Sequence, residues 1–506
     1  MNNKPKNGKR LATQQSVNQV IKNVCDILRR SNVSSAIQYV PELTWILFLR
    51  IFDEREAIEA EEAEAVGAAF APSIEYPYRW QDWASPRGPK RTELQMGTLG
   101  GVFSFVNDEL LPYLKGLENR PNATPRQKII SEALSGVTRT RVDTERNLLD
   151  VLDRIDQVHL GDIDDTHIFA LSQVYEGLLL RMGERNSDGG QFFTPREIIR
   201  SMVRVVNPRV GETVYDPCCG TGGFLAQCYE YMYAALKPGD GPDRVETLKR
   251  HTFYGREKED LVYPIALANL VLHGIDEPHI WHGNTLTGQE SYGGLFAGAP
   301  NQYKVILTNP PFGGKEGLDA QTRFAYKTGA TQVLFLQHVI DSLAHEGRCG
   351  IVVDEGLLFR TNETAFVQTK RKLLDECDLY CVVSLPGGVF TAAGAGVKTN
   401  LLFFTKGRPT EQTWYYDLSD LKVGKNTPFT MDKLEDFFRL FPERGNSARS
   451  WTVPRADIEA KNYDLKAVNP TAKAEGDTRT PEELLDIIEA KGREVAEALA
   501  ALRALR

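Results

Sequence analysis

The stretch that decides the fold is Val214-Tyr-Asp216-Pro-Cys-Cys-Gly220-Thr221-Gly222-Gly223-Phe224. Apolar residues up to Asp216 predict a short buried strand, and the residues after Gly223 predict a helix. Three glycines between them allow the backbone to turn tightly and to approach a ligand, while the first N–H groups of the helix face an anion. Taken alone, the stretch also fits a purely structural strand–helix turn.

Strands and helices alternate from about residue 161 onward. The predicted strands are Thr213–Tyr215, Thr252–Gly255, Lys304–Thr308, Cys349–Val353, Tyr380–Ser384 and Leu401–Thr405. A helix is predicted over Gln332–His345, where apolar residues recur every three or four positions. This alternation predicts an α/β fold with a doubly wound, mostly parallel sheet, in which ligands bind at the carboxyl ends of the strands.

Residues 1–160 are predicted to form an all-helical domain in front of a 161–470 domain. Apolar residues from Val17 to Leu28 mark one buried helical face, and a second helix is expected to start near Pro41 and to run into Asp53–Glu64. Further amphipathic segments are Leu99–Leu114, Lys128–Leu134 and Leu148–Ile155. The basic arm at Lys4–Arg10 either aids solubility or contacts phosphate.

Residues 471–506 are predicted to form a linker and a terminal amphipathic helix. Thr480-Pro481-Glu482-Glu483 has the capping hydroxyl, early proline and glutamate of a helix start. Leu485, Ile488, Gly492, Val495, Leu499 and Leu502 then follow at spacings of three and four. This helix either folds back on its own chain or pairs with helices of another subunit.

The carboxylate of Asp216 narrows the choice of ligand. It repels phosphate and attracts an ammonium group, so the ligand is expected to carry both charges, as the methionine end of S-adenosylmethionine does. Asn284, further along the chain in Gly283-Asn284-Thr-Leu, is a candidate for the amino edge of an adenine.

Glu257, at the end of the next predicted strand, is the candidate for ribose hydroxyls, with Glu259 and Asp260 as competitors. Glu257 follows Asp216 by 41 residues, against the roughly 20 of the dinucleotide motif. A loop at Lys237–Pro242 is expected to account for the excess.

The predicted strand Lys304–Thr308 delivers Asn309-Pro310-Pro311-Phe312 at its carboxyl end. Two prolines fix the backbone, so the Asn309 side-chain oxygen and the Pro310 carbonyl can act as two acceptors in one place. Such a pair suits a planar NH₂ group, and Phe312 offers a stacking face for the ring that carries it. The predicted methyl acceptor is therefore an exocyclic amine or an amide.

In this order of motifs the sequence resembles the N6-adenine DNA methyltransferases, most closely the modification subunit of type I restriction-modification systems. The motifs are Gln191-Phe-Phe193-Thr194-Pro195-Arg196, the 216–224 turn and the 309–312 turn. The resemblance implies a class I, Rossmann-like methyltransferase with S-adenosylmethionine as cofactor. It implies cofactor contacts by the 191–195 segment, namely Gln191, Phe193, Thr194 and Pro195, and contact of Phe390 with a flipped base. Asn284 stands where such enzymes commonly carry Asp.

The resemblance also implies the partners: double-stranded DNA, a specificity subunit that chooses the site, a second copy of this chain and a restriction subunit. No Gly-x₄-Gly-Lys-Ser/Thr motif occurs, so the translocating ATPase is expected on another chain. Alternatives are a stand-alone adenine methyltransferase of another phage-defence system, a protein-glutamine N-methyltransferase, and a binding subunit that has lost its activity.

Composition agrees with an ordinary globular protein. The 506 residues carry 60 Lys+Arg and 68 Asp+Glu, a formal net charge of −8, so nucleic acid must be held by a local patch. Seven scattered cysteines and the absence of a long apolar run predict a cytoplasmic protein without a membrane segment. Neither Cys218-Cys219 nor Cys377-x₃-Cys381 has a second pair of ligands at zinc spacing, so we expect no metal.

Overall fold

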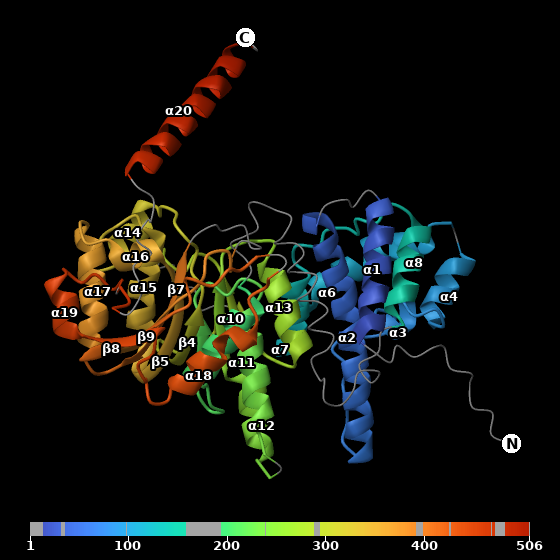
Figure 1. Cartoon of the computed structure of the whole chain (residues 1–506). Helices are drawn as coiled ribbons and strands as arrows, with labels where there is room; N and C mark the ends of the chain where they lie inside the picture. The colour runs from blue at the N-terminus through green and yellow to red at the C-terminus, as the bar shows by residue number, and fades with distance from the viewer. Residues whose placement is uncertain are drawn as a thin grey trace.

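A computed structural model describes residues 14–31, 36–97, 99–157, 194–237, 239–287, 294–390, 398–424, 427–466, 468–470 and 481–504. The first part is helical (Figure 1). Its elements are α1 (Gln14–Arg30), α2 (Ala36–Ala65), α3 (Trp80–Trp83), α4 (Pro89–Met96), α5 (Gly101–Ser104), the π-helix Phe105–Leu110, α6 (Leu111–Lys115), the 3₁₀ turn Leu117–Asn119, α7 (Pro125–Ala133) and α8 (Glu145–Ile155). The helix expected near Pro41 starts earlier, at Ala36, and Pro41 lies inside it.

The second part is built around one nine-stranded sheet in the order β3-β2-β1-β4-β5-β7-β6-β8-β9. The strands are β1 (Val214–Asp216), β2 (Phe253–Glu257), β3 (His279–His282), β4 (Tyr303–Thr308), β5 (Leu343–Asp354), β6 (Cys377–Ser384), β7 (Thr399–Lys406), β8 (Gln412–Asp417) and β9 (Ser450–Pro454). β7 runs antiparallel between β5 and β6, and β9 runs antiparallel to β8. The other pairs are parallel, which confirms the doubly wound, mostly parallel α/β sheet.

Helices cover both faces of this sheet (Figure 1). They are α10 (Arg196–Val206), α11 (Gly223–Ala234), α12 (Pro242–Arg250), α13 (Tyr263–His273), α14 (Leu318–Arg323), α15 (Thr331–Ser342), α16 (Glu355–Phe359), α17 (Thr364–Glu376), α18 (Glu435–Leu440) and α19 (Arg455–Ala460), with 3₁₀ turns at Gly294–Phe296 and Met431–Leu434. On β4, Val305 and Leu307 belong to the core shared with the helical part, whereas Ile306 faces the core under α15 and α17. Burial on both faces explains why the strand is apolar without alternation.

Two predicted details are wrong. The helix expected over Gln332–His345 ends at Ser342, because Leu343 is already buried in β5 and pairs with Tyr303 of β4. The excess spacing before Glu257 is not explained by a loop alone, since helix α12 begins at Pro242 and contributes nine residues.

Helix α13 joins the two parts of the chain. Nearly all of its side chains are buried, and its neighbours in the core include residues of α2 and α7 as well as of α11. A helix that is apolar on all sides has to be enclosed on all sides. The helical part and the sheet therefore share one continuous hydrophobic core.

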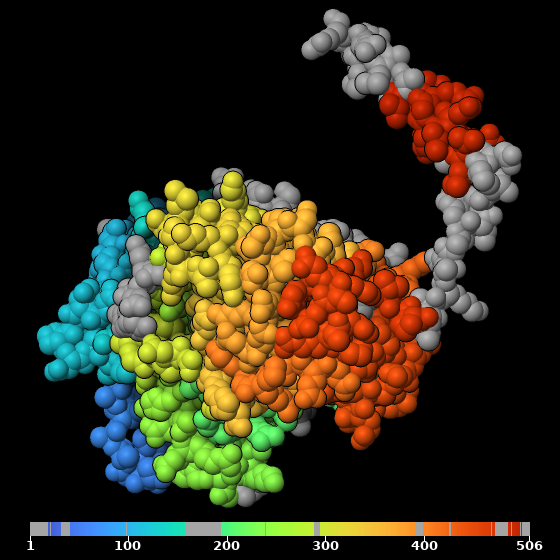
Figure 2. All heavy atoms as spheres, turned by 90° about the vertical axis from the view of Figure 1, so that its left-hand side faces the viewer, coloured from blue at the N-terminus to red at the C-terminus, as the bar shows by residue number. Residues whose placement is uncertain are grey.

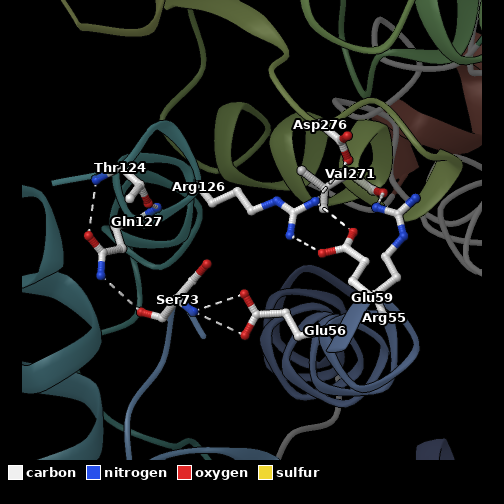
Figure 3. Close-up of polar contacts among 9 residues, drawn as sticks. All are labelled: Arg55, Glu56, Glu59, Ser73, Thr124, Arg126, Gln127, Val271 and Asp276. Atoms are coloured by element: carbon white, nitrogen blue, oxygen red, sulfur yellow. Dashed lines mark hydrogen bonds and ion pairs between the residues drawn. The ribbon is translucent and has the colours of Figure 1, made fainter. Parts of the chain in front are cut away.

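Charged side chains lie at the edge of the contact between α13 and the helical part (Figure 3). Arg126 of α7 forms a bidentate ion pair with Glu59 of α2, with N–O distances of 2.5 and 2.7 Å. Its Nη2 also lies 3.4 Å from Oδ1 of Asp276, just beyond α13. Arg55 of α2 donates to the carbonyl of Val271 on α13, at 2.7 Å. Arg126 is thus the cation shared by carboxylates from both parts.

Helix α20 (Pro481–Ala504) stands away from the rest of the molecule in Figures 1 and 2. Leu485, Ile488 and Val495, three residues of the predicted apolar seam, are 58–65% exposed. Within the described residues, no helix has the length and apolar content that a membrane crossing needs.

Replacing Arg126 by alanine is expected to reduce the free energy of unfolding by about 1–3 kcal/mol, because Glu59 and Asp276 lose their shared cation in a partly buried site. Chemical denaturation followed by circular dichroism measures the change. Arg371→Ala is the control, since Arg371 and Asp375 are both about half exposed and such pairs contribute at most ~0.5 kcal/mol. Equal losses in the two variants would contradict the assignment.

Candidate active site

The carboxyl ends of β1, β2 and β4 meet at one edge of the sheet. Parallel pairing places Asp216 beside Gly255, two residues before Glu257, and pairs Tyr215 with Ile306 of β4. The Thr308 hydroxyl, at the end of β4, donates to Asp216 Oδ1 at 2.7 Å. The glycine-rich turn and the Asn-Pro-Pro turn are thus joined by a direct hydrogen bond.

Two carboxylates hold the glycine-rich turn through backbone N–H groups. Asp216 Oδ1 accepts from the N–H of Cys218 at 3.2 Å, and Glu257 Oε2 accepts from the N–H of Gly220 at 2.8 Å. The turn needs glycine at Gly222, where φ is +80° and an added Cβ would lie 3.0 Å from Leu270 of α13. Helix α11 begins at the next residue, as predicted.

Burial dominates the electrostatics of this turn. Asp216 and Glu257 are 1% and 7% exposed. Loss of water raises the pKa of each carboxyl to about 7, although their hydrogen bonds oppose the change. Burial therefore disfavours the charged form of both groups, and a cationic ligand would favour the charged form of Asp216.

Of the three acidic candidates at the end of β2 and just beyond it, Glu257 is the one that accepts a hydrogen bond from the glycine-rich turn. Its Oε1 also accepts from the N–H groups of Lys258 and Glu259, both at 2.8 Å. Glu259 and Asp260 are exposed, and Asp260 pairs with His282 on the surface. The geometry therefore favours Glu257 over its competitors, and its contact with ribose hydroxyls stays a prediction.

Asn309 presents a buried acceptor without a partner. Its Nδ2 donates to the Thr194 hydroxyl at 3.0 Å, whereas its Oδ1 is buried and has no hydrogen-bond partner. A buried carbonyl oxygen left unpaired is destabilising by about 1–3 kcal/mol. The atom thus fits the role predicted for it, because an NH₂ group could supply the missing hydrogen bond.

The aromatic residues of the site touch each other. Phe312 is partly buried, and its ring meets the ring of Phe390 edge to face at 5.4 Å between centroids. Phe390 is 2% exposed. In this structure Phe390 supports Phe312, which leaves Phe312 as the more accessible stacking surface. Pro310 is buried and Pro311 partly buried beside them.

The turn at Asn284 is used locally. Asn284 Oδ1 accepts from the N–H of Leu286 at 2.9 Å, so this oxygen caps its own turn, and recognition of an adenine edge by Asn284 stays a prediction. The next residue, Thr285, donates to the carbonyl of Pro217 at 2.5 Å and ties the turn to the glycine-rich segment.

Sequence reasoning missed three polar residues that support the site. Thr308 and Thr285 join neighbouring turns, and the buried Asn269 of α13 donates to the carbonyl of Thr221 at 2.8 Å. For Thr308 and Asn269 the available signal was a polar residue in an otherwise apolar buried element. Of the predicted 191–195 contacts, Gln191 and Phe193 lie outside the described residues; Thr194 and Pro195 are described, and Pro195 immediately precedes α10.

Two protein-family models match this chain. The N-6 DNA Methylase model matches residues 166–478, and the HsdM N-terminal domain model matches residues 17–154. The chain belongs to the N-6 DNA methylase family. It is therefore an adenine-specific DNA methyltransferase, and the predicted resemblance to type I modification subunits is confirmed.

Individual relatives agree over nearly the whole chain. The chain is 33% identical to the type I restriction enzyme EcoEI methylase subunit of Escherichia coli, covering 95% of this chain and 96% of that protein. A modification subunit of a putative type I restriction enzyme from Vibrio vulnificus has a crystal structure with a TM-score of 0.79 at 30% identity, covering 92% and 99% of the two chains. A chain from a study of complex assembly in a type I restriction-modification system gives 0.75 at 34% identity, with 97% and 98% coverage.

Asp216→Asn is expected to stabilise the protein increasingly as the pH rises from 5 to 8. The raised pKa of Asp216 means that the folded state must lose a proton near pH 7 that the unfolded state has already lost near pH 4, so charging Asp216 reduces stability with rising pH. Asparagine carries no charge and avoids this loss. Between pH 5 and 8 we expect the free energy of unfolding of Asp216→Asn to rise by about 1–4 kcal/mol relative to the unchanged chain.

Urea denaturation at pH 5, 6.5 and 8 measures the difference between Asp216→Asn and the unchanged chain. Asp240→Asn is the control, because hydrogen bonds lower the pKa of the partly exposed Asp240 and its charge does not change in this range. A stability difference that stays constant or shrinks with pH would show that Asp216 is not held in the way described.

Proposed function

We propose that this chain transfers a methyl group from S-adenosylmethionine to the N6 amino group of adenine in double-stranded DNA, as the modification subunit of a type I restriction-modification complex. The observation that carries the proposal is the unpaired, buried Asn309 Oδ1 at the end of β4, tied through Thr308 to the carboxylate of the glycine-rich turn. Family membership supports the same reaction.

The residues of the turn fit the proposed cofactor. Asp216 would bind the ammonium group of its methionine end, the backbone of Gly220–Gly223 would approach it closely, and Glu257 would accept hydrogen bonds from its ribose. Thr221, Asn284 and the 191–195 segment complete the proposed set of contacts. When bound, S-adenosylmethionine supplies a methyl group activated by its positively charged sulfur.

Asn309 and its neighbours would prepare the acceptor. The adenine leaves the base stack, which costs a few kcal/mol, and its ring rests on Phe312 with Phe390 behind. Asn309 Oδ1 accepts one N6 hydrogen and the Pro310 carbonyl accepts the other, which shifts electron density toward the nitrogen lone pair. No strong base is needed, because the nitrogen can attack first and lose one proton to solvent after the methyl group has been transferred, and most of the rate enhancement comes from positioning.

The partners in this proposal follow from the relatives. Type I methylase subunits match almost the whole chain, including the helical part. We propose that a separate specificity subunit chooses the DNA site, that two copies of this chain join it, and that a restriction subunit completes the nuclease. The exposed apolar seam of α20 is the proposed surface for association.

Asn309→Ala is expected to reduce methylation of adenine by at least about 100-fold, because the acceptor oxygen for N6 is removed. Transfer of a labelled methyl group to DNA measures the rate, and calorimetric titration checks that S-adenosylmethionine still binds. Asn301→Ala, at an exposed residue before β4, is the control. Undiminished methylation by Asn309→Ala, or label found on protein instead of adenine, would refute the proposal.

Deleting residues 481–506 is expected to weaken association with the specificity subunit while leaving the affinity for S-adenosylmethionine within about threefold, because the exposed seam is lost and the turn at 216–224 is untouched. Size-exclusion chromatography of the mixed subunits measures assembly. The control is the full chain with Glu489→Gln, a change at an exposed polar position of α20. Unchanged assembly of the shortened chain would exclude this role for α20.

A further inference from the structure

The amide of Asn309 has two orientations related by a half turn, and only one serves the proposed reaction. With Oδ1 directed at the substrate, the amide accepts an N6 hydrogen; with Nδ2 there, two donors would face each other. The oxygen and the NH₂ group are similar in size, so packing discriminates poorly between the two. A specific hydrogen bond is therefore needed to hold the amide in the productive orientation. The inference below rests on the proposed function.

Thr194 provides that contact. Its hydroxyl oxygen accepts a hydrogen from Asn309 Nδ2 at 3.0 Å, which leaves Oδ1 as the unpaired buried atom. The two residues are 115 positions apart in the chain, so the bond is a product of the tertiary fold.

The position of Thr194 is well supported from its own side. The carbonyl of Pro195 accepts from the N–H groups of Ile198 and Ile199, at 3.0 and 3.1 Å, which anchors the segment to the first turn of α10. Helix α10 in turn buries Ile198, Met202 and other apolar residues against the sheet. The hydroxyl is therefore placed by the same core that places β4.

We propose that Thr194 is a positioning residue for methyl transfer: its hydroxyl selects the Asn309 orientation in which Oδ1 receives the N6 amino group. The resemblance implies a cofactor contact for Thr194, which is a different role. The two are compatible, because a hydroxyl that accepts the Asn309 hydrogen can still donate its own hydrogen elsewhere.

Removing the hydroxyl has a definite consequence for the reaction. The Asn309 amide either turns and presents N–H to the substrate, or keeps its orientation with an unsatisfied donor. Both outcomes weaken the step in which the nitrogen attacks. Neither touches Asp216, Glu257 or the glycine-rich turn, so at most the proposed contact of Thr194 itself is lost and the rate is expected to fall more than the affinity for the cofactor.

The test compares Thr194→Val, which keeps the shape and loses the hydroxyl, with Thr194→Ser, which keeps the hydroxyl. The full chain is assayed with its specificity subunit. For Thr194→Val we expect kcat to fall roughly 10-fold or more, and the dissociation constant for S-adenosylmethionine to rise by a smaller factor. For Thr194→Ser we expect kcat within about threefold of the unchanged chain. Thr92→Val is the control, since that hydroxyl bonds the carbonyl of Gly88 in the helical part.

An unchanged kcat in Thr194→Val overturns the inference, and so does a loss confined to cofactor affinity. Thr194→Ala repeats the test should valine prevent folding, and retained binding of S-adenosylmethionine verifies the folded site in either variant. Asn309→Ala distinguishes failure of the proposed function from failure of the role of Thr194. If Asn309→Ala is fully active, the proposed function is wrong. If Asn309→Ala is inactive while Thr194→Val has a normal kcat, only the role of Thr194 is wrong.

Discussion

The hydrogen bond from Thr308 to Asp216 is the contact on which the arrangement of the site depends. It links the end of β4, which carries the Asn-Pro-Pro turn, to the end of β1, which opens the glycine-rich turn. Both groups are fully buried, where such a bond has no competition from water. Together with the backbone pairing of β1 and β4, this bond holds the segment proposed to bind the donor beside the segment proposed to bind the acceptor.

Much of the sheet could be predicted from the chain alone. β1, β2, β4 and β7 were expected to within a few residues, because apolar runs bounded by turn residues are a strong signal for buried strands. β8 and β9 were not expected, although the Thr413–Tyr416 run is typical of a strand. β9 ends in Pro454, which suits a strand at the edge of a sheet and conceals it in a search for central strands.

The candidate site was predictable where chemistry dictates residue type. Asp216, Glu257 and Asn309 all lie at strand ends on one edge of the sheet, as their places at the ends of predicted strands implied. Thr308, Thr285 and Asn269 were missed, because each acts through a contact with a residue far away in the sequence. The pairing of Thr194 with Asn309 has the same origin: no local pattern announces a bond that only the folded chain creates.

The enclosure of α13 bears on how such chains can be recombined. The helical part is described up to residue 157 and the α/β part from residue 194, but the core does not divide between them, since α13 packs on α2 and α7. A hybrid that takes its first 157 residues from a relative would place that relative's side chains against the unchanged α13 of this chain. Grafts of this kind should carry the matching surface of α13, and Asp276 opposite Arg126, along with the helices.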